Sequence, residues 1–257
     1  MGTALIVIIY GLTAAAANLL GGFFVSSRRL GQTTLRYLIA LGAGFMLAAV
    51  FLKIVPETIA IWEGQAAQPM IFLMVGYLLI QLFEHTIAPH FHFGEEVHHD
   101  AMLEHHAALA GVAALMIHAF FDGVSIAAAA LVNTQLGVLI FIAILLHKLP
   151  EGFTVASMML ASKRSSRSAL MAALSIGIAT FAGVALVLLF HQVAVYSHPL
   201  SSYFLPLSAG VTLYVAASDL IPEVNKEEGA TTSLIVFAGV AMLYLVELLL
   251  EAFHLNH

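Results

Sequence analysis

The stretch LGAGFMLAAVFLKIVPE, residues 41–57, decides how this chain folds, because it recurs as LSAGVTLYVAASDLIPE at residues 207–223. The two stretches align without gaps and share a leading Leu, an Ala-Gly pair, a Leu and a closing Pro-Glu. Small residues and proline also recur in helix bundles because they permit close packing. We interpret the match, with Pro-Glu at the same depth in both copies, as an internal duplication.

The chain around these stretches is far more apolar than a soluble domain. Of its 257 residues, 61% are hydrophobic and 9% are charged, and the mean hydropathy is +0.99. Crossing the hydrocarbon as a helix takes roughly 20 mainly apolar residues. The sequence therefore predicts an all-α membrane protein with eight transmembrane helices, at about 3–25, 34–58, 69–89, 107–131, 136–161, 169–191, 201–222 and 232–253.

Cationic residues predict the orientation of these helices. Seven of the nine fall on one side of an eight-helix bundle: Arg28, Arg29, Arg36, Lys163, Arg164, Arg167 and Lys226. That side is cytoplasmic by the positive-inside rule, so both termini are predicted outside. The two repeat stretches then cross in opposite directions, which makes the duplication an inverted repeat, as is typical of transporters. Lys53 and Lys148 fall within predicted spans.

A second pair of related stretches lies in the fourth and fifth predicted helices. HAFFDGVSIA covers residues 118–127 and HKLPEGFTVA covers residues 147–156. Positions four apart lie on one face of a helix, so His118 with Asp122, and His147 with Glu151, each form a two-ligand arm. The short turn around VNTQ makes the two helices antiparallel neighbours, so the arms are expected to face each other.

Two imidazoles and two carboxylates suit a borderline divalent cation, above all Zn(II), whereas Mg(II) or Ca(II) favour oxygen ligands alone. Carboxylates inside a membrane are costly unless they have a partner or a function. Hydrogen bonding between helices is the alternative reading of these four residues. Two copies at the same spacing favour a metal site.

These residues resemble the ZIP (Zrt/Irt-like) family of metal transporters along essentially the whole chain. The two His-x-x-x-(Asp/Glu)-Gly arms, the Pro-Glu endings and a His-rich third connection carry the likeness. The resemblance implies a single transmembrane domain over 1–257, with helices 1–3 and 6–8 as inverted repeats around helices 4 and 5. It further implies alternating access toward the cytosol, a possible homodimer and, as primary ligands, the four arm residues with Met46.

The chain departs from the pattern at a second metal site that many relatives have. The matching positions hold Ala119, Lys148 and, by a less certain alignment, Thr180. We expect the second site to be absent and the Lys148 ammonium to stand near where the second cation would bind. A purely structural ion pair is the alternative for Lys148.

Other polar residues give weaker expectations. The connection at residues 90–106 holds six histidines and four acids; its candidates for weak metal binding are His98, His99, His105 and His106. Asp219 and Glu223 match an exit path in the family. Glu57 is a pathway candidate at the other end, although the nearby Lys53 would repel an incoming cation.

The sequence thus predicts a carrier of Zn(II), with Cd(II), Fe(II), Mn(II) and Co(II) as possible ions, and no bond chemistry. The alternative is an intramembrane zinc hydrolase, in which a metal-bound water attacks a lipid or peptide. No His-Glu-x-x-His stretch supports that alternative. Nucleic-acid binding is excluded by composition, and short connections favour a bacterial inner membrane.

Overall fold

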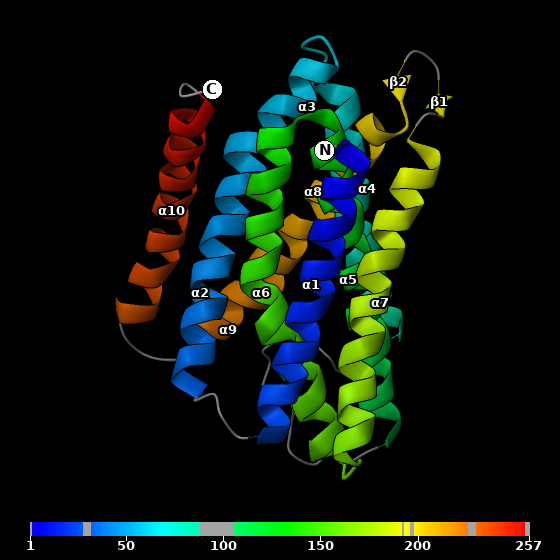
Figure 1. Ribbon diagram of the computed structural model, residues 1–257, viewed down its shortest axis with the longest axis vertical. Helices are drawn as coiled ribbons and strands as arrows, with labels where there is room; N and C mark the ends of the chain where they lie inside the picture. Colours follow the sequence, from blue (N-terminus) through cyan, green and yellow to red (C-terminus); the bar gives the residue numbers. More distant parts are fainter. Residues whose placement is uncertain are drawn as a thin grey trace.

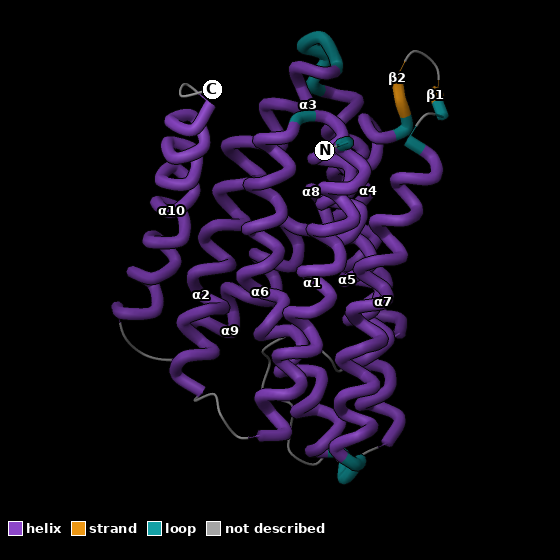
Figure 2. Tube along the Cα trace, viewed as in Figure 1, coloured by secondary structure: helices purple, strands orange, loops and turns teal. Residues whose placement is uncertain are grey.

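The computed structural model describes residues 2–27, 32–87, 105–191, 193–195, 198–225 and 230–254, and these are almost entirely helical (Figures 1 and 2). The first half contains α1 (Thr3–Ser27), α2 (Gln32–Ala49), η1 (Val50–Ile54), α3 (Val55–Ile61) and α4 (Ala67–Ile87). The two long central helices are α5 (His105–Val132) and α6 (Thr134–Ala161). The remaining elements are α7 (Ser166–Phe190), β1 (Ala194–Val195), β2 (His198–Pro199), α8 (Ser201–Tyr214), η2 (Val215–Leu220), α9 (Ile221–Asn225) and α10 (Ala230–His254).

The two repeat stretches each contain a π-helical turn at nearly the same place. In η1 the Val55 amide bonds the carbonyl of Val50, and in η2 the Ile221 amide bonds the carbonyl of Ala216, so both bonds reach five residues back. A proline follows each amide by one residue and removes the next amide of the ladder. The helix therefore rearranges locally instead of ending, and α2–η1–α3 and α8–η2–α9 are continuous helical runs.

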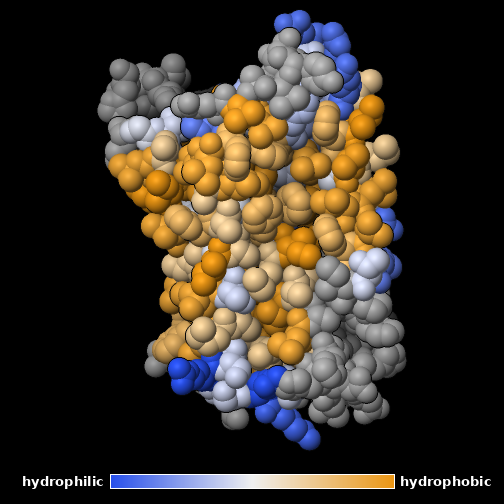
Figure 3. Space-filling view, turned by 90° about the vertical axis from the view of Figure 1, so that its right-hand side faces the viewer, coloured by the Kyte–Doolittle hydropathy of each residue, from blue (hydrophilic) through white to orange (hydrophobic). Residues whose placement is uncertain are grey.

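The helices bear out a multi-pass helical membrane protein. Six described helical stretches are long and apolar enough to cross a bilayer, and Ala67–Phe83 is a shorter apolar helix. The run from α8 to α9, where a span was expected at 201–222, is not among the six. Side chains on the view in Figure 3 form an apolar belt between two hydrophilic ends, as a bilayer requires.

The helices that contain the two related stretches, α2 and α8, each cross a neighbouring helix at a glycine. A Cβ on Gly44 of α2 would overlap the carbonyl of Val236 in α10. A Cβ on Gly210 of α8 would likewise overlap the carbonyl of Leu73 in α4. Gly44 and Gly210 are equivalent positions of the repeat, so the same backbone approach occurs on both sides of the bundle.

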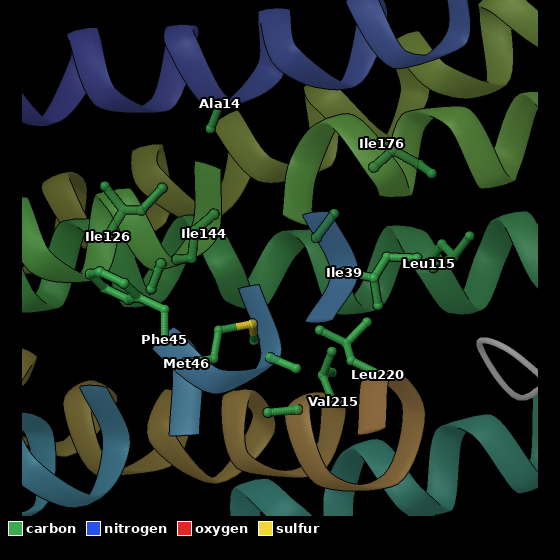
Figure 4. Close-up of a cluster of buried hydrophobic side chains, with 14 of the residues drawn as sticks. Ala14, Ile39, Phe45, Met46, Leu115, Ile126, Ile144, Ile176, Val215 and Leu220 are labelled. Atoms are coloured by element: carbon green, nitrogen blue, oxygen red, sulfur yellow. The ribbon is translucent and has the colours of Figure 1, made fainter. Parts of the chain in front are cut away.

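The core lies between these flanks and the central pair α5 and α6. Figure 4 shows side chains from several helices meeting there, including Met46 of α2, Ile144 of α6 and Val215 of η2, all buried. The start of α1 and the end of α10 lie at one end of the bundle, and the α6–α7 connection that carries Lys163 lies at the other (Figure 1).

Candidate metal site

A one-residue connection places the two arms opposite each other. Asn133 separates α5 from α6, and its side-chain oxygen accepts hydrogen bonds from the amides of Gln135 (2.8 Å) and Leu136 (3.2 Å). This N-cap satisfies two amides that the first turn of α6 would leave unpaired. The tight reversal makes α5 and α6 antiparallel neighbours, as the VNTQ turn predicts.

The four arm residues come together in the centre of the bundle. One ligand atom from each of His118, Asp122, His147 and Glu151 can be chosen so that all lie within 4.8 Å of one another, and all four residues are buried. The Nε2 atoms of His118 and His147 lie 3.1 and 3.3 Å from Oδ2 of Asp122. A tetrahedral zinc ion with ligand distances of about 2.0 Å holds its ligand atoms about 3.3 Å apart. The spacing of these three atoms therefore suits such an ion.

His147 lies between two oxygen acceptors. Its Nδ1 lies 3.1 Å from the carbonyl of Ala143, and its Nε2 lies 3.3 Å from Oδ2 of Asp122. A neutral ring carries one proton, so it can donate to only one of these oxygens. In the tautomer that donates from Nδ1 to Ala143, Nε2 presents a lone pair toward the centre, and a backbone carbonyl in this position is the usual support of a metal-binding histidine.

Lys148 supplies a positive charge at this place. Its side chain is fully buried, and its ammonium lies 2.6 Å from Oδ2 of Asp122 and donates to Oε2 of Glu151. Oδ2 of Asp122 is thus shared by two imidazoles and one ammonium. A metal ion bound at that oxygen would compete directly with Lys148.

Several polar atoms at the centre make no hydrogen bond within the described part of the chain: Nδ1 of His118, Oδ1 of Asp122 and Oε1 of Glu151. Burying an unsatisfied polar atom costs about 1–3 kcal/mol. Free acceptor oxygens on both carboxylates are consistent with a site that binds a cation there.

Glycines bring a flanking helix against each arm. A Cβ on Gly152, next to Glu151, would overlap the carbonyl of Asn18 in α1. A Cβ on Gly123, next to Asp122, would overlap the carbonyl of Thr180 in α7. Gly123 and Gly152 occupy the same position in the two arms, directly after the carboxylate, so both arms have a close crossing there.

The positions expected to replace a second metal site fall at these crossings. Ala119 and Lys148 each lie one turn before the crossing glycine on their helix. Thr180 is fully buried, and its hydroxyl donates to the carbonyl of Ile176 at 3.2 Å. Lys148 contacts both carboxylates, as the second-cation hypothesis requires, and the absence of a second ion remains a prediction.

Met46 is buried in the core on a helix that touches the site. A Cβ on Gly42, one turn earlier in α2, would lie 3.7 Å from Cβ of His147, an ordinary contact. This places the face of α2 that carries Met46 against α6. Its role as a ligand stays a prediction from the resemblance.

The pathway candidates are not among the four converging ligands. Asp219 is buried in η2, and Glu57 in α3 lines a cavity of about 150 Å³ at the end of the bundle where α1 begins. The same cavity is lined by Lys53, Asn133 and Glu247.

Lys53 forms an ion pair with Glu247 of α10. The positive charge of Lys53, which was expected to repel an entering metal ion, is therefore balanced by a carboxylate. The side chain of Glu223 lies outside the described part.

The His-rich connection is described only at its end. His98 and His99 lie outside the described residues, and His105 and His106 form the start of α5, where only their backbone is described. α5 therefore begins two residues before the span expected at 107–131.

Two residues that the structure places at these sites have no role assigned from the sequence. Asn18 lies in α1 against Gly152, and its buried amide could have been noticed as a polar residue within an apolar span. Glu247 could not be assigned as the partner of Lys53, because the pair joins residues 194 positions apart.

The fold and the centre together define a multi-pass helical membrane protein with a buried cluster of metal-ligand type. The profile of the ZIP zinc transporter family matches residues 94–247, more than half of the chain. The chain belongs to the ZIP zinc transporter family.

Individual relatives agree with this assignment. Zinc transporter SLC39A7 of the rat, Rattus norvegicus, is 32% identical over 143 residues, which cover 52% of this chain and 31% of the relative. Zinc transporter zipt-7.2 of Caenorhabditis elegans is 27% identical over 140 residues, covering 52% and 30%. Zinc transporter ZIP13 of Pongo abelii is 25% identical over 241 residues, covering 86% and 69%. The matched part spans about a third of the length of the SLC39A7 relatives.

Proposed function

We propose that this protein carries divalent metal ions, Zn(II) above all, across a membrane toward the cytoplasm, and that it catalyses no bond chemistry. The observation that carries the proposal is the buried convergence of His118, Asp122, His147 and Glu151 on two membrane-length helices. The relatives' names as zinc transporters support it. Cd(II), Fe(II), Mn(II) and Co(II) accept the same ligands to different extents.

The architecture proposed for this function is a single transmembrane domain over residues 1–257, with eight spans in a 3+2+3 arrangement. The first and last three helices form inverted repeats around α5 and α6. The matched crossings at Gly44 and Gly210, and at Gly152 and Gly123, support this symmetry. Alternating access then requires that the ligands face one side of the membrane at a time.

The site is proposed to take one ion and to use Lys148 in place of a second. With neutral imidazoles the four ligands carry a charge of −2, and the lysine brings the empty site to −1. One divalent ion then gives +1. An empty site of low net charge costs less to move through a low-dielectric interior. The contacts of Lys148 with both carboxylates support this assignment.

The path is proposed to begin at the cavity lined by Glu57 and to end near Asp219 and Glu223. Both termini are then outside, and the membrane is a bacterial inner membrane. Homodimer formation and weak metal binding by His98, His99, His105 and His106 are further parts of the proposal. The clustering of Lys163, Arg164 and Arg167 at the end away from the cavity supports this orientation.

The test is zinc uptake into proteoliposomes that contain a trapped fluorescent zinc indicator. The native protein should show saturable uptake, and His147→Ala and Glu151→Ala should abolish it. His191→Ala, which removes a histidine at the end of α7 whose Nδ1 lies 2.7 Å from the carbonyl of Leu188, is the matched control and should transport normally.

A native protein that binds zinc but moves none under several imposed gradients would overturn the transporter proposal. The intramembrane hydrolase would then be tested directly with lipid and peptide substrates. A catalytic zinc keeps a coordination position open for water. The four converging side chains leave less room for such a position than a three-ligand site does.

A further inference from the structure

The side chain of Asn18 is a buried amide in α1 whose bonding capacity is unused. Its residue is fully buried, and neither Oδ1 nor Nδ2 has a hydrogen-bond partner among the described residues. An amide offers two acceptor and two donor positions, and leaving a buried polar group unpaired costs about 1–3 kcal/mol. An apolar residue of similar size would avoid this cost, so the amide calls for a partner in another state of the protein.

Three contacts place Asn18 beside the lysine arm. A Cβ on Gly152 would meet the backbone of Asn18, and a Cβ on Gly21, one turn further along α1, would meet the backbone of α6 at Leu149, Gly152 and Phe153. Nearer the start of both helices, the rings of Tyr10 and Phe141 stack at 4.2 Å. Contacts near the start of α1 thus fall near the start of α6 and later ones fall later, so the two helices run parallel, and Figure 1 shows both descending through the bundle.

The direction of helical side chains then brings the amide toward Lys148. Side chains on an α-helix lean toward the N-terminus of their own helix. Asn18 is level with Gly152, and α1 and α6 are parallel, so its amide leans toward the turn of α6 that precedes Gly152. Lys148 lies in that turn and on the same helix face, four residues before Gly152.

The α6 arm and the α5 arm differ in the residues found at their equivalent glycine crossings. Asn18 with Lys148 on the α6 arm corresponds to Thr180 with Ala119 on the α5 arm, through the crossings at Gly152 and Gly123. Thr180 bonds its own helix, and Ala119 has no polar group. The flanking residue whose side-chain amide makes no hydrogen bond among the described residues, Asn18, therefore lies beside α6, the helix that carries the Lys148 ammonium.

We propose that Asn18 is a positioning residue for the transported ion: its amide oxygen accepts the Lys148 ammonium when a divalent ion occupies Asp122 and Glu151. This inference rests on the proposed function. In the empty site the ammonium is bonded to both carboxylates, and the amide is unused. An ion held by the two Nε2 atoms and Oδ2 of Asp122 takes the oxygen that the ammonium contacts at 2.6 Å, and a buried ammonium that loses this acceptor opposes the ion. Asn18 removes that penalty by giving the ammonium a new acceptor within the membrane.

The experiment is a double-mutant cycle on zinc affinity, measured calorimetrically with the full-length protein in detergent. The variants are Asn18→Leu, which has similar volume and no acceptor, Lys148→Met, and the double variant. Asn18→Leu should weaken zinc binding about tenfold, the value of one hydrogen bond to a charged group. In the Lys148→Met background the same substitution should change affinity by less than about twofold, because the ammonium is gone.

Two further variants keep the result interpretable. Asn18→Ser retains an acceptor and should recover part of the lost affinity. Asn18→Ala, which has no acceptor and adds no bulk, is used for the cycle if Asn18→Leu does not fold. Thr13→Val is the matched control, because Thr13 is an exposed α1 residue whose hydroxyl bonds the carbonyl of Ile9 at 2.8 Å. It should leave zinc affinity unchanged.

Each outcome separates the inference from the function on which it rests. Equal weakening in both backgrounds would show that Asn18 acts without Lys148 and would overturn the inference, as would no weakening in either. Both of those results leave the transporter proposal intact. A native protein that binds no divalent ion would overturn the proposed function and this inference together.

Discussion

The two lysines within the membrane-spanning helices have opposite surroundings. Lys148 has a fully buried side chain and bonds two carboxylates at the centre of the bundle. Lys53 has a side chain that is 25% exposed, and it pairs with Glu247 at the cavity lined by Glu57. Sequence alone places both lysines in apolar helices and does not show which carboxylates they meet.

The difference shows how position decides what a charge does. A buried ammonium cannot exchange its partners for water, so its bond to Oδ2 of Asp122 competes with any bond of an incoming ion to that oxygen. A partly exposed ammonium remains partly hydrated, and its pair contributes little stability. Lys148 is therefore expected to influence metal binding itself, and Lys53 only the approach of the ion.

The largest effect is expected from Lys148→Met. Removing the ammonium leaves two buried carboxylates without their cation, and the free energy of unfolding of the metal-free protein should fall by about 3–5 kcal/mol. Zinc should restore more stability than it adds to the native protein, since ligand binding stabilises the folded state. Thermal unfolding in detergent, with and without zinc, measures both.

Metal stoichiometry sharpens the same prediction. If Lys148 stands in for a second cation, its removal should allow a second bound ion per chain, counted by elemental analysis. Unchanged stoichiometry together with unchanged transport would end the idea that the lysine replaces an ion.

A smaller effect is expected from Gly152→Ala, which disturbs the helix that holds Lys148. The new methyl group would overlap the carbonyl of Asn18 and push α1 away from α6. Overpacking of this kind typically costs about 1–3 kcal/mol. Gly42→Ala is the control, because its Cβ would meet Leu146 and His147 of α6 at 3.6–3.7 Å, which is ordinary contact. Equal unfolding temperatures for the two variants would contradict the close crossing.

At the cavity, Asn133→Ala tests the reversal that aligns the two arms. Loss of this N-cap should lower the free energy of unfolding by about 1 kcal/mol, because the amides of Gln135 and Leu136 lose their acceptor. Thr134→Ala, a change at the neighbouring residue that keeps the cap, serves as the comparison in denaturation in detergent. If Asn133→Ala lowered the free energy of unfolding as much as Lys148→Met does, residues at the cavity would contribute as much to stability as the buried charges, contrary to the expected difference.

The smallest effect on stability is expected from Lys53→Gln, within about 0.2–1 kcal/mol. The change frees Glu247 and makes the cavity more negative, so zinc uptake at low ionic strength should rise modestly and the gain should vanish at high salt. Lys163→Gln, at the opposite end, is the control in the same flux assay. A loss of uptake would show that Lys53 does more than pair with Glu247.

Much of the fold could be predicted because its signals are local. Apolar stretches identify the helices, and i, i+4 spacing places each histidine on one face with its carboxylate. The π-helical turns at Val50–Ile54 and Val215–Leu220 were not predicted, although Pro56 and Pro222 mark their positions. The start of α5 at His105 was not predicted either, since a polar His-rich segment does not reveal where a helix begins.

By itself, the sequence determined the apolar helices and the two His-carboxylate arms, because hydrophobic length and helical periodicity depend on neighbours within a few turns. Only the tertiary structure decided that Lys148 bonds both carboxylates, that Lys53 meets Glu247, and that Asn18 lies against the lysine arm. These contacts depend on crossings at glycines and on residues far apart in the chain, and burial at those crossings sets the strength of each charge interaction.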